Sequence, residues 1–292
     1  MRNLGIITVT YNSQAVINGF MNSLLSQTYS NWHLYVVDSG SNDDTLNEIK
    51  KIPHNNQVTI LALNENVGFA KGNNIAVKRA IDDGCDELLL INNDTLFASD
   101  FLAKLVLERE VYPNTVLAPK MYATDGQHIW AAGGGFKPHN AWAAYHCGDG
   151  ELDTGQYDKD IICSFVPMCC VLIPLDIWRV VGELDEKYFI YSEDADWFYR
   201  ALQKNIKSVY CYKPEIIHKV SSLTGGTKSK NGASFGTRNR VYFICKHFRG
   251  WTKYRYLSKY FIGMLISLLL GKYSWQEFKW RLPAFFDGLK IK

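Results

Sequence analysis

An α/β fold with a mostly parallel sheet flanked by helices is predicted by three observations on this sequence. In the first hundred residues, β-branched runs alternate with segments whose apolar residues recur at helical spacing. Such alternation is typical of a parallel sheet covered by helices on both faces. Four of the apolar runs end in polar residues, and the chain of 292 residues is 47% apolar, which suits a sizeable core.

The predicted strands and helices follow one another in a regular order. LGIITVTYN (4–12) is expected to be a buried strand, followed by a helix over 13–27. The elements expected next are a strand starting at HLYVVD (33–38), a helix over 43–51, a strand in QVTILALNEN (57–66), a loop and helix in GFAKGNNIAVKRAID (68–82), and a strand in DELLLINNDTLF (86–97). Because ligands of such sheets bind beyond the carboxyl ends of the strands, the polar ends at 11–12, 38–39, 64–66 and 92–94 predict a site.

Three carboxylates lie close together in YFIYSEDADWFYRAL (188–202), among many aromatic residues. Aromatic surroundings deprive a carboxylate of water, so crowded acids need partners or a function. A helix fits residues 192–204, and Asp196 and Arg200, four residues apart, are expected to pair on its surface. Glu193 is placed to cap the helix start. Asp194 falls in the first turn, where the helix dipole favours an ionised carboxylate. It is the one acid of the three for which no structural role is expected.

Other candidate residues have ordinary structural explanations beside the functional ones. NND (92–94) offers the oxygen ligands that Mg²⁺ or Mn²⁺ prefer, but Asn and Asp also favour plain turns. Asp38 is placed either to hydrogen-bond a base or ribose, or to cap a turn. GFAKGNN offers backbone N–H groups and Lys71 to a phosphate, although it is not the GxGxxG fingerprint. His218 ends an apolar run, where a histidine is more often structural than a ligand.

The composition of the chain changes near residue 245. Residues 1–245 hold 22 basic and 27 acidic residues, whereas residues 246–292 hold ten basic and two acidic ones. The tail also contains YFIGMLISLLL (260–270), which is far shorter than the ~20 residues needed to span a bilayer. A short apolar helix flanked by Lys, Arg and Trp is typical of a helix lying on an anionic membrane surface. A helix packed on the rest of the protein, with its charges solvated, is the alternative.

The order of the motifs is more specific than any one of them. Along residues 4–245 the chain contains, in succession, VTYN, VVDSGSNDDT, ENVGFAKGNN, LLLINND, GELDEKYFIYSEDADWFYRAL, IIH with SSLTGG, and TRNR. This order resembles the family 2 glycosyltransferases of GT-A fold, especially bacterial rhamnosyltransferases that build polysaccharides and lipid-linked glycans. The resemblance implies a GT-A catalytic domain over 1–245, with a nucleotide-binding half over about 1–110 and an acceptor-binding half over 111–245. It extends loosely through FFDGLK into the helical segment over 246–292.

The resemblance also implies roles for individual residues. Asp194 corresponds to the general base, Asp94 to a ligand in the DxD metal motif, and His218 to a histidine that completes the metal shell. Asn92 replaces the first Asp of that motif, which leaves fewer protein charges for the Mg²⁺ or Mn²⁺. Asp38 corresponds to the residue that reads the base. The residues expected around the donor are Thr10, Tyr11, Asn12, Asp38, Asn66, Lys71 and Asn93, and those expected to contact or support the acceptor are Glu193, Trp197 and Arg238.

The expected function is therefore inverting transfer of a sugar to a glycan or lipid-linked acceptor in bacterial polysaccharide biosynthesis. The donor would be dTDP-rhamnose or a UDP-sugar. A sugar-phosphate nucleotidyltransferase is one alternative, but it normally has a Gly-rich, Arg-containing loop after the first strand, and VTYNSQAV has neither residue. An inactive nucleotide-sugar-binding or membrane-scaffold protein is another, and the presence of Asp38, Asp94 and Asp194 argues against it.

The sequence also predicts where the protein acts. The chain begins with a strand after a short lead, so no signal peptide is expected. Its seven cysteines, an odd number without a CxxC pair, are expected to be reduced and buried. We expect a cytoplasmic protein that binds peripherally to the inner face of the cell membrane and has no nucleic-acid partner.

Overall fold

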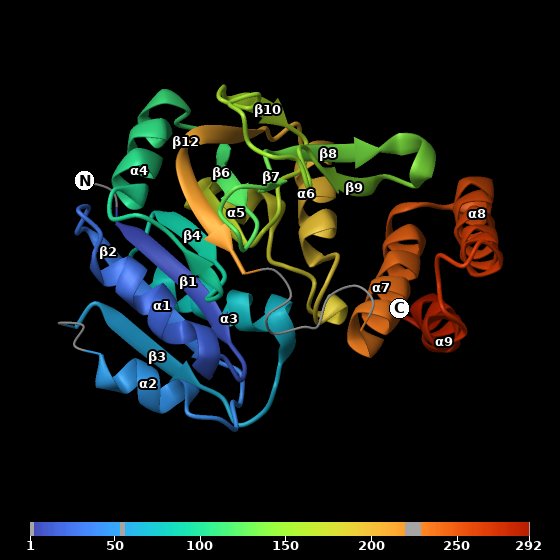
Figure 1. Ribbon diagram of the computed structural model, residues 1–292, viewed down its shortest axis with the longest axis horizontal. Coiled ribbons are helices and arrows are strands. Elements are labelled where there is room, and N and C mark those ends of the chain that lie inside the picture. The colour runs from blue at the N-terminus through green and yellow to red at the C-terminus, as the bar shows by residue number, and fades with distance from the viewer. Residues whose placement is uncertain (1–2, 53–55, 220–228, 292) are drawn as a thin grey trace.

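The computed structural model describes residues 3–52, 56–219 and 229–291 (Figure 1). The predicted alternation of strands and helices is present in its N-terminal part. The elements there are β1 Leu4–Thr10, α1 Gln14–Leu25, β2 Trp32–Asp38, α2 Thr45–Lys51, β3 Val58–Ala62, α3 Gly68–Asp82, β4 Glu87–Ile91, β5 Thr95–Leu96 and α4 Phe101–Val111. The helix-spaced apolar residues of α1 are all buried, as their spacing predicts: Val16, Ile17, Phe20 and Leu24.

The following part has shorter strands and more loops. Its elements are β6 Val116–Tyr122, β7 Ile129–Ala131, β8 Gly134–Lys137, η1 Pro138–Asn140, β9 Ala143–His146, β10 Ile161–Cys163, β11 Cys170–Pro174, α5 Leu175–Val181, η2 Glu186–Tyr188, α6 Glu193–Gln203 and β12 Ser208–His218. Three helices complete the chain: α7 Lys230–His247, α8 Gly250–Leu269 and α9 Trp275–Lys290. The motif SSLTGG (221–226) lies outside the described residues.

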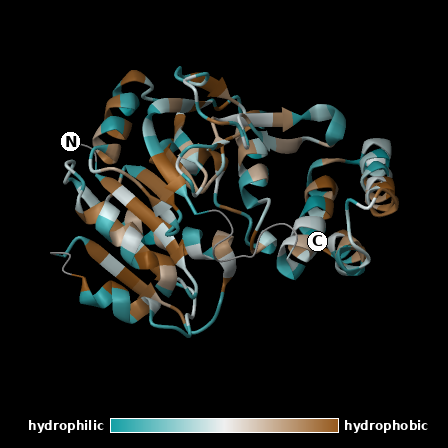
Figure 2. Ribbon diagram, in the orientation of Figure 1, coloured by the Kyte–Doolittle hydropathy of each residue, from teal (hydrophilic) through white to brown (hydrophobic). Residues whose placement is uncertain are grey.

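Within the described residues, one large sheet has the strand order β10-β12-β6-β11-β4-β1-β2-β3. The neighbours β1–β2, β2–β3, β1–β4 and β6–β12 are parallel, and β11 is the antiparallel strand between β4 and β6. Helices α1 and α2 cover the front of β1 to β3 in Figure 1, while α3 packs on the other face, where Gly72 approaches Val9. Figure 2 shows the hydrophobic residues concentrated in the central strands. The mostly parallel α/β fold is therefore confirmed.

The register of the parallel strands brings their polar ends to one edge. Thr10 at the end of β1 lies opposite Asp38 at the end of β2, and Asp38 lies opposite Ala62 at the end of β3. The expected strand over 86–97 is interrupted, because residues 92–94 form a turn in which Thr95 Oγ1 donates to Asn92 O at 2.7 Å. The chain then leaves β4 and pairs with the end of β12 through β5. This turn is the feature that brings NND next to His218.

Helix α7 connects the two hydrophobic clusters of the molecule. Its Tyr242 and Phe243 belong to the main core, whereas Val241 and Ile244 pack with residues of α8 and α9. The predicted boundary at residue 245 falls inside this helix, two residues before its end. Because one helix serves both clusters, the C-terminal helices are joined to the rest of the structure by packing as well as by the chain.

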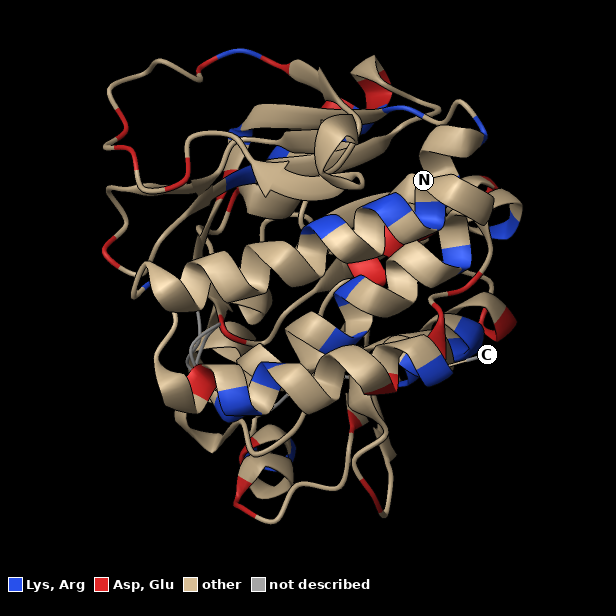
Figure 3. Ribbon diagram, turned by 90° about the vertical axis from the view of Figure 1, so that its right-hand side faces the viewer, with Lys and Arg blue, Asp and Glu red and all other residues tan. Residues whose placement is uncertain are grey.

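Helix α8 has two apolar faces. One contains the buried residues Tyr256, Leu257 and Met264 and packs against α7 and α9. The other face is exposed. It carries Trp251 and Tyr254 near the start of the helix and Ile262, Leu265, Ile266 and Leu269 in its second half. Lysines and arginines lie on the N-terminal half of α8, and the half from residue 260 onward carries none (Figure 3). In the described parts of the chain, no helix combines the length and the hydropathy that a membrane span requires.

Candidate active site

A cavity of about 580 Å³ opens at the carboxyl ends of β1, β2 and β4. The turn before α6 also lines it. Seven of the residues predicted for the site line this cavity: Tyr11, Asn66, Asn93, Asp94, Glu193, Asp194 and His218. Six others do not: Thr10, Asn12, Asp38, Lys71, Trp197 and Arg238. The structure thus brings the NND turn, the end of β12 and the acidic helix start together around one space.

Asp38 is fully buried behind the cavity, where it organises the ends of β1 and β2. Its Oδ1 accepts hydrogen bonds from Thr10 Oγ1 at 2.8 Å and Ser41 Oγ at 2.5 Å, and its Oδ2 accepts one from the Ser41 N–H at 3.0 Å. Asn12, in the left-handed region with φ of 49°, completes the same loop by accepting from the Asn42 N–H. These contacts give Asp38 the turn-capping role that was the structural alternative for it. They leave Oδ2 with capacity for one further donor.

Asn66, Asn93 and Lys71 have different positions around the cavity. Asn66 Oδ1 accepts from the Gly68 N–H at 2.9 Å, which fixes the loop that leads into α3. Asn93 is buried, and its Nδ2 donates to Val9 O at 2.7 Å. Its Oδ1 has no hydrogen-bond partner among the described residues. Lys71 is exposed on the second turn of α3, away from the cavity lining.

Asp94 and His218 form the candidate metal centre. Both side chains are nearly buried, and Asp94 Oδ1 lies 3.3 Å from His218 Nε2. The sheet sets this distance, because His218 at the end of β12 pairs with Thr95, the neighbour of Asp94. Burial lowers the pKa of His218, whereas the neighbouring Asp94 carboxylate raises it.

The geometry of these two groups fits a divalent cation. Neighbouring ligands on an octahedral Mg²⁺ or Mn²⁺ lie about 3 Å apart, because each bond is about 2.1 Å long. The 3.3 Å separation is close to that value, and the buried Asn93 Oδ1 on the adjacent residue is an additional oxygen without a partner among the described residues. A cation bound here would require a neutral His218, since only a neutral imidazole is a ligand.

Glu193 and Asp194 are the first two residues of α6, and both line the cavity. Burial and then the adjacent Asp194 charge raise the pKa of Glu193 to about 8. Burial also raises the pKa of Asp194, to about 6, against the effect of the Ala195 N–H, which donates to Asp194 Oδ1 at 2.6 Å. Burial thus disfavours the charged form of both neighbouring carboxyl groups, and the Asp194 charge adds to this effect for Glu193.

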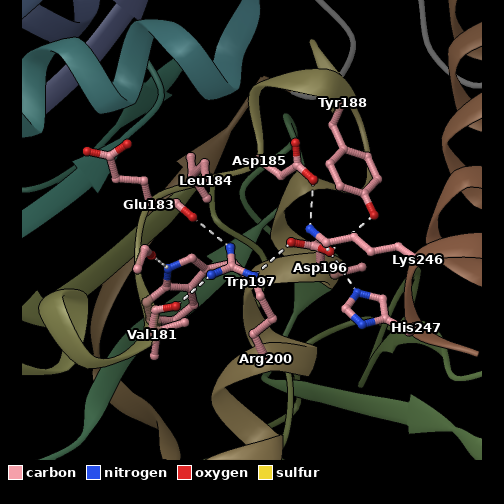
Figure 4. A network of polar contacts seen from close by, with 12 residues as sticks. Val181, Glu183, Leu184, Asp185, Tyr188, Asp196, Trp197, Arg200, Lys246 and His247 are labelled. Carbon is pink, nitrogen blue, oxygen red and sulfur yellow. Dashed lines mark hydrogen bonds and ion pairs between the residues drawn. The ribbon is translucent and has the colours of Figure 1, made fainter. Parts of the chain in front are cut away.

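The third acid of the cluster has a structural role. The predicted pairing of Asp196 with Arg200 is confirmed at 2.9 Å, but the prediction that it lies on the helix surface is wrong, because Asp196 is fully buried. Helix α7 covers it, and Lys246 Nζ and His247 Nε2 each lie 2.7 Å from Asp196 Oδ1 (Figure 4). Burial alone would raise the pKa of Asp196, but the hydrogen bond from His247 and the positive charges hold it well below its usual range.

Trp197 and Arg238 support the site from behind. Trp197 is fully buried, stacks on Trp178 and donates through Nε1 to Gly182 O at 2.8 Å, so it presents no surface to a ligand. Arg238 donates to the backbone carbonyls of Lys187 and Tyr188, which precede the acidic helix start.

The structure adds cavity residues that were not predicted. Trp130 lies between two histidine rings, with ring centroids 4.7 Å from His146 and 4.5 Å from His218. Gly68, where α3 begins, also lines the cavity and has a φ of 79°. Its position in ENVGFAKGNN was visible in the sequence, whereas no local pattern marks Trp130 or His146.

The sequence and the fold both have known relatives. Residues 5–139 match glycosyl transferase family 2. A dTDP-rhamnosyl transferase of Shigella flexneri is 24% identical over 208 residues, which cover 70% of this chain and 64% of the Shigella protein. An N-acetylglucosaminyl-diphospho-decaprenol L-rhamnosyltransferase of Mycobacterium tuberculosis is 23% identical over 272 residues, covering 85% of this chain and 86% of its own length.

A crystal structure of GalNAc-T7 with UDP, GalNAc and Mn²⁺ has a similar fold. It superposes with a TM-score of 0.62 at 15% identity, over 83% of this chain and 50% of the GalNAc-T7 chain. At this identity the likeness concerns the fold alone. The match spans about half of that protein.

Proposed function

We propose that this chain, whose residues 5–139 match glycosyl transferase family 2, transfers a sugar, with inversion, from a nucleotide-diphosphate donor to a glycan or lipid-linked acceptor. One observation carries the proposal: the Asp94–His218 pair and the Glu193–Asp194 pair line the same cavity. Groups suited to a diphosphate and a carboxylate suited to an acceptor hydroxyl thus border one space that a sugar would occupy.

Asp194 is the general base of the proposed reaction. The acceptor oxygen forms a bond to the anomeric carbon from the face opposite the diphosphate, and the bond from that carbon to the diphosphate oxygen breaks. Asp194 accepts the proton of the acceptor hydroxyl as the new bond forms, a contribution of ~10²–10⁴ in rate. Its half-buried position and raised pKa, about 6, suit a base that is ionised yet able to hold a proton near neutral pH.

Asp94 and His218 would hold a divalent cation, Mg²⁺ or Mn²⁺, with Asn93 beside them. The cation, when bound, neutralises the charge that develops on the leaving diphosphate. Support comes from the 3.3 Å spacing of the two ligand atoms and from the Mn²⁺ in the GalNAc-T7 structure. NND has one carboxylate where the DxD motif has two. The negatively charged diphosphate oxygens would supply the remaining charge that balances the cation.

The donor nucleotide is proposed to lie along the ends of β1 and β2. Tyr11 and Asn66 line this part of the cavity, and Asp38 behind them has one lone pair left for the ring N–H that uracil and thymine share. Thr10 and Asn12 would act by holding this loop, and Lys71 by its charge at the start of α3. The Shigella relative favours dTDP-rhamnose as the donor, and UDP in the GalNAc-T7 structure favours a UDP-sugar.

The acceptor is proposed to be attached to a lipid, with the exposed face of α8 resting on an anionic membrane. Leu269 is 83% exposed and Trp251 81%, at the two ends of one stripe, and the basic residues of α8 lie beside it. Each basic residue near an anionic surface contributes about 1 kcal/mol. The cytoplasmic leaflet is the anionic one, so we place the protein peripherally on the inner face of the membrane. The acceptor of the Mycobacterium relative is carried on decaprenol, which supports this proposal.

The experiment that tests the function is a donor panel. The protein is incubated with dTDP-rhamnose, UDP-N-acetylglucosamine or GDP-mannose, with Mn²⁺ or Mg²⁺, and with N-acetylglucosamine linked through diphosphate to a polyprenol. Release of nucleoside diphosphate that depends on the acceptor, and a product of inverted anomeric configuration, are the expected results. Release of inorganic pyrophosphate from a nucleoside triphosphate and a sugar phosphate would instead identify a nucleotidyltransferase.

A further inference from the structure

The turn that delivers Asp194 to the cavity has an unusual backbone. Phe189, Tyr191 and Ser192 have φ values of 64°, 69° and 69°, and none of them is glycine. A residue with a side chain in this region costs about 1–3 kcal/mol, and such conformations persist only where the surroundings hold them. The catalytic turn, defined as residues 188–192, must therefore be restrained by contacts from outside it.

Asn239 on α7 supplies the most concentrated of these contacts. Its side chain is fully buried, and its Nδ2 lies 2.9 Å from Tyr188 O, 2.7 Å from Ile190 O and 2.6 Å from Tyr191 O. An amide nitrogen carries two hydrogens, so three carbonyls of the catalytic turn share them. The Oδ1 of Asn239 accepts from Arg238 Nε at 2.8 Å, which orients the amide with its nitrogen toward the turn.

The same helix holds both ends of the catalytic turn. Before it, Asp185 Oδ2 accepts from Tyr242 Oη at 2.8 Å and from Lys246 Nζ at 2.7 Å. After it, Asp196 is bound by Lys246 and His247, as Figure 4 shows. Residues 239, 242 and 246 are spaced so that they share one face of α7. That face therefore contacts the chain before, within and after the catalytic turn, and Asn239 makes the contacts within it.

Helix α3 closes the other side of the catalytic turn. The Phe69 N–H donates to Phe189 O at 2.6 Å. A Cβ on Gly68 would lie 2.5 Å from both the ring and the carbonyl oxygen of Phe189, so only glycine allows this approach. The turn is thus fixed between the start of α3 and one face of α7, and Asp194 follows it by two residues.

We propose that Asn239 is a positioning residue for catalysis: by binding three carbonyls of the catalytic turn, it fixes where the Asp194 carboxylate stands in the cavity. This inference rests on the proposed function, in which Asp194 is the base. Asn239 itself does not line the cavity. A carboxylate displaced by about 1 Å from an acceptor hydroxyl can lose about 10² in rate, while a donor bound on the sheet side of the cavity is little affected.

The test compares Asn239→Leu, which keeps the side-chain size but removes both N–H donors, with Arg240→Met. Arg240 is on the same helix and donates to the carbonyls of Asn140 and Ala141, away from the catalytic turn. We expect Asn239→Leu to lower kcat by about 10² and to change KM for the donor by less than about threefold. Hydrogen exchange of the Phe189, Ile190 and Asp196 amides should become faster in this variant only.

Each outcome bears on the proposal. A kcat for Asn239→Leu within about twofold of that for Arg240→Met, or unchanged amide exchange, would overturn it. If Asn239→Leu does not fold, Arg238→Met, which removes the donors to Lys187 O and Tyr188 O, takes its place with an expected loss in kcat of about tenfold. If the wild-type protein transfers sugar from no donor, the proposed function fails, and the exchange rates alone decide whether Asn239 holds the turn.

Discussion

Replacing Asp194 with asparagine removes the proposed base with almost no change in size, and Glu193→Gln makes the same change one residue earlier. The two carboxyl groups share the start of α6 and the same cavity, but they differ in protonation. The pKa of Glu193 is raised to about 8, so at pH 7 it is mostly a neutral acid, which glutamine imitates. Asp194→Asn removes a charge and a proton acceptor, whereas Glu193→Gln removes neither.

The expected loss in turnover for Asp194→Asn is ~10²–10⁴, the contribution of a positioned general base. Glu193→Gln should remain within about threefold of wild type at pH 7, since the group it replaces is neutral there. The base works only when ionised, so activity of the wild type should fall as the pH drops below about 6, the value to which burial raises the pKa of Asp194. The activity of the Glu193→Gln variant should fall in the same way below about pH 6.

Stability gives a second, independent readout of the same carboxylate. The pKa of Asp194 is higher in the folded protein than in the unfolded chain, so the folded state holds the proton more tightly. Protonated Asp194 stabilises the fold fully at pH values below the pKa that Asp194 has in the unfolded chain. This stabilisation is lost as the pH rises through about 6, the pKa of Asp194 in the folded protein. At pH 7 the ionised, half-buried Asp194 therefore destabilises the fold, and Asp194→Asn should melt at the same temperature as wild type or higher.

The assay is acceptor-dependent release of nucleoside diphosphate at saturating donor, measured from pH 5 to 9, with thermal melting of the same samples. An Asp194→Asn protein that keeps more than about a tenth of wild-type turnover would refute the assignment. If Glu193→Gln instead loses ~10²-fold or more while Asp194→Asn stays near wild type, Glu193 is the base. A drop in melting temperature that parallels the loss of turnover would mean that Asp194 is structural.

Three further outcomes are expected. In calorimetry with Mn²⁺, Asp94→Ala should weaken binding of the nucleoside diphosphate by more than tenfold and leave binding of the free nucleoside unchanged. EDTA should abolish sugar transfer by the wild type, and full activity in EDTA would exclude a catalytic metal. Asp38→Ala should weaken the binding of UDP and of dTDP alike by about tenfold, because hydrogen bonds to charged groups contribute about 1.5–3 kcal/mol. Unchanged binding of both nucleotides would mean that Asp38 only caps the turn. The double variant Leu265→Glu, Leu269→Glu should reduce flotation with anionic vesicles at least tenfold, because burying each leucine side chain in the membrane contributes about 1.5–3 kcal/mol of binding free energy. The control variant Leu107→Glu, which changes an exposed leucine on α4, should float as wild type does.

The strand ends of the site could be predicted from the sequence because each is a local signal. An apolar run followed by a polar residue marks the end of a buried strand, and parallel pairing then brings those ends to one edge. The register of Thr10 with Asp38 confirms this reasoning. It fails in detail at residues 92–94, where a turn divides the expected strand, because the choice of β5 to pair with β12 depends on a partner more than a hundred residues away.

The buried position of Asp196 shows what local spacing misses. Its separation of four from Arg200 predicts an ion pair correctly, but the same pattern occurs on exposed helices. What buries it is α7, whose Lys246 and His247 are about fifty residues further along the chain. The contacts of Asn239 also join α7 to a segment about fifty residues earlier in the chain. TRNR was therefore recognisable as a motif, but the role of its asparagine could not be predicted from the sequence.

This dependence on α7 also decides how membrane binding should be tested. A chain ending near residue 245 would remove the exposed face of α8, but it would also remove Lys246 and His247, the two partners that α7 gives Asp196. Asp196 is fully buried, and stripping partners from a buried carboxylate costs about 3–5 kcal/mol. Such a chain would lose activity whether or not α8 binds lipid. Substitutions on the exposed face of the full-length protein separate the two effects, because Leu265 and Leu269 lie outside the hydrophobic cluster that joins α8 to α7 and α9.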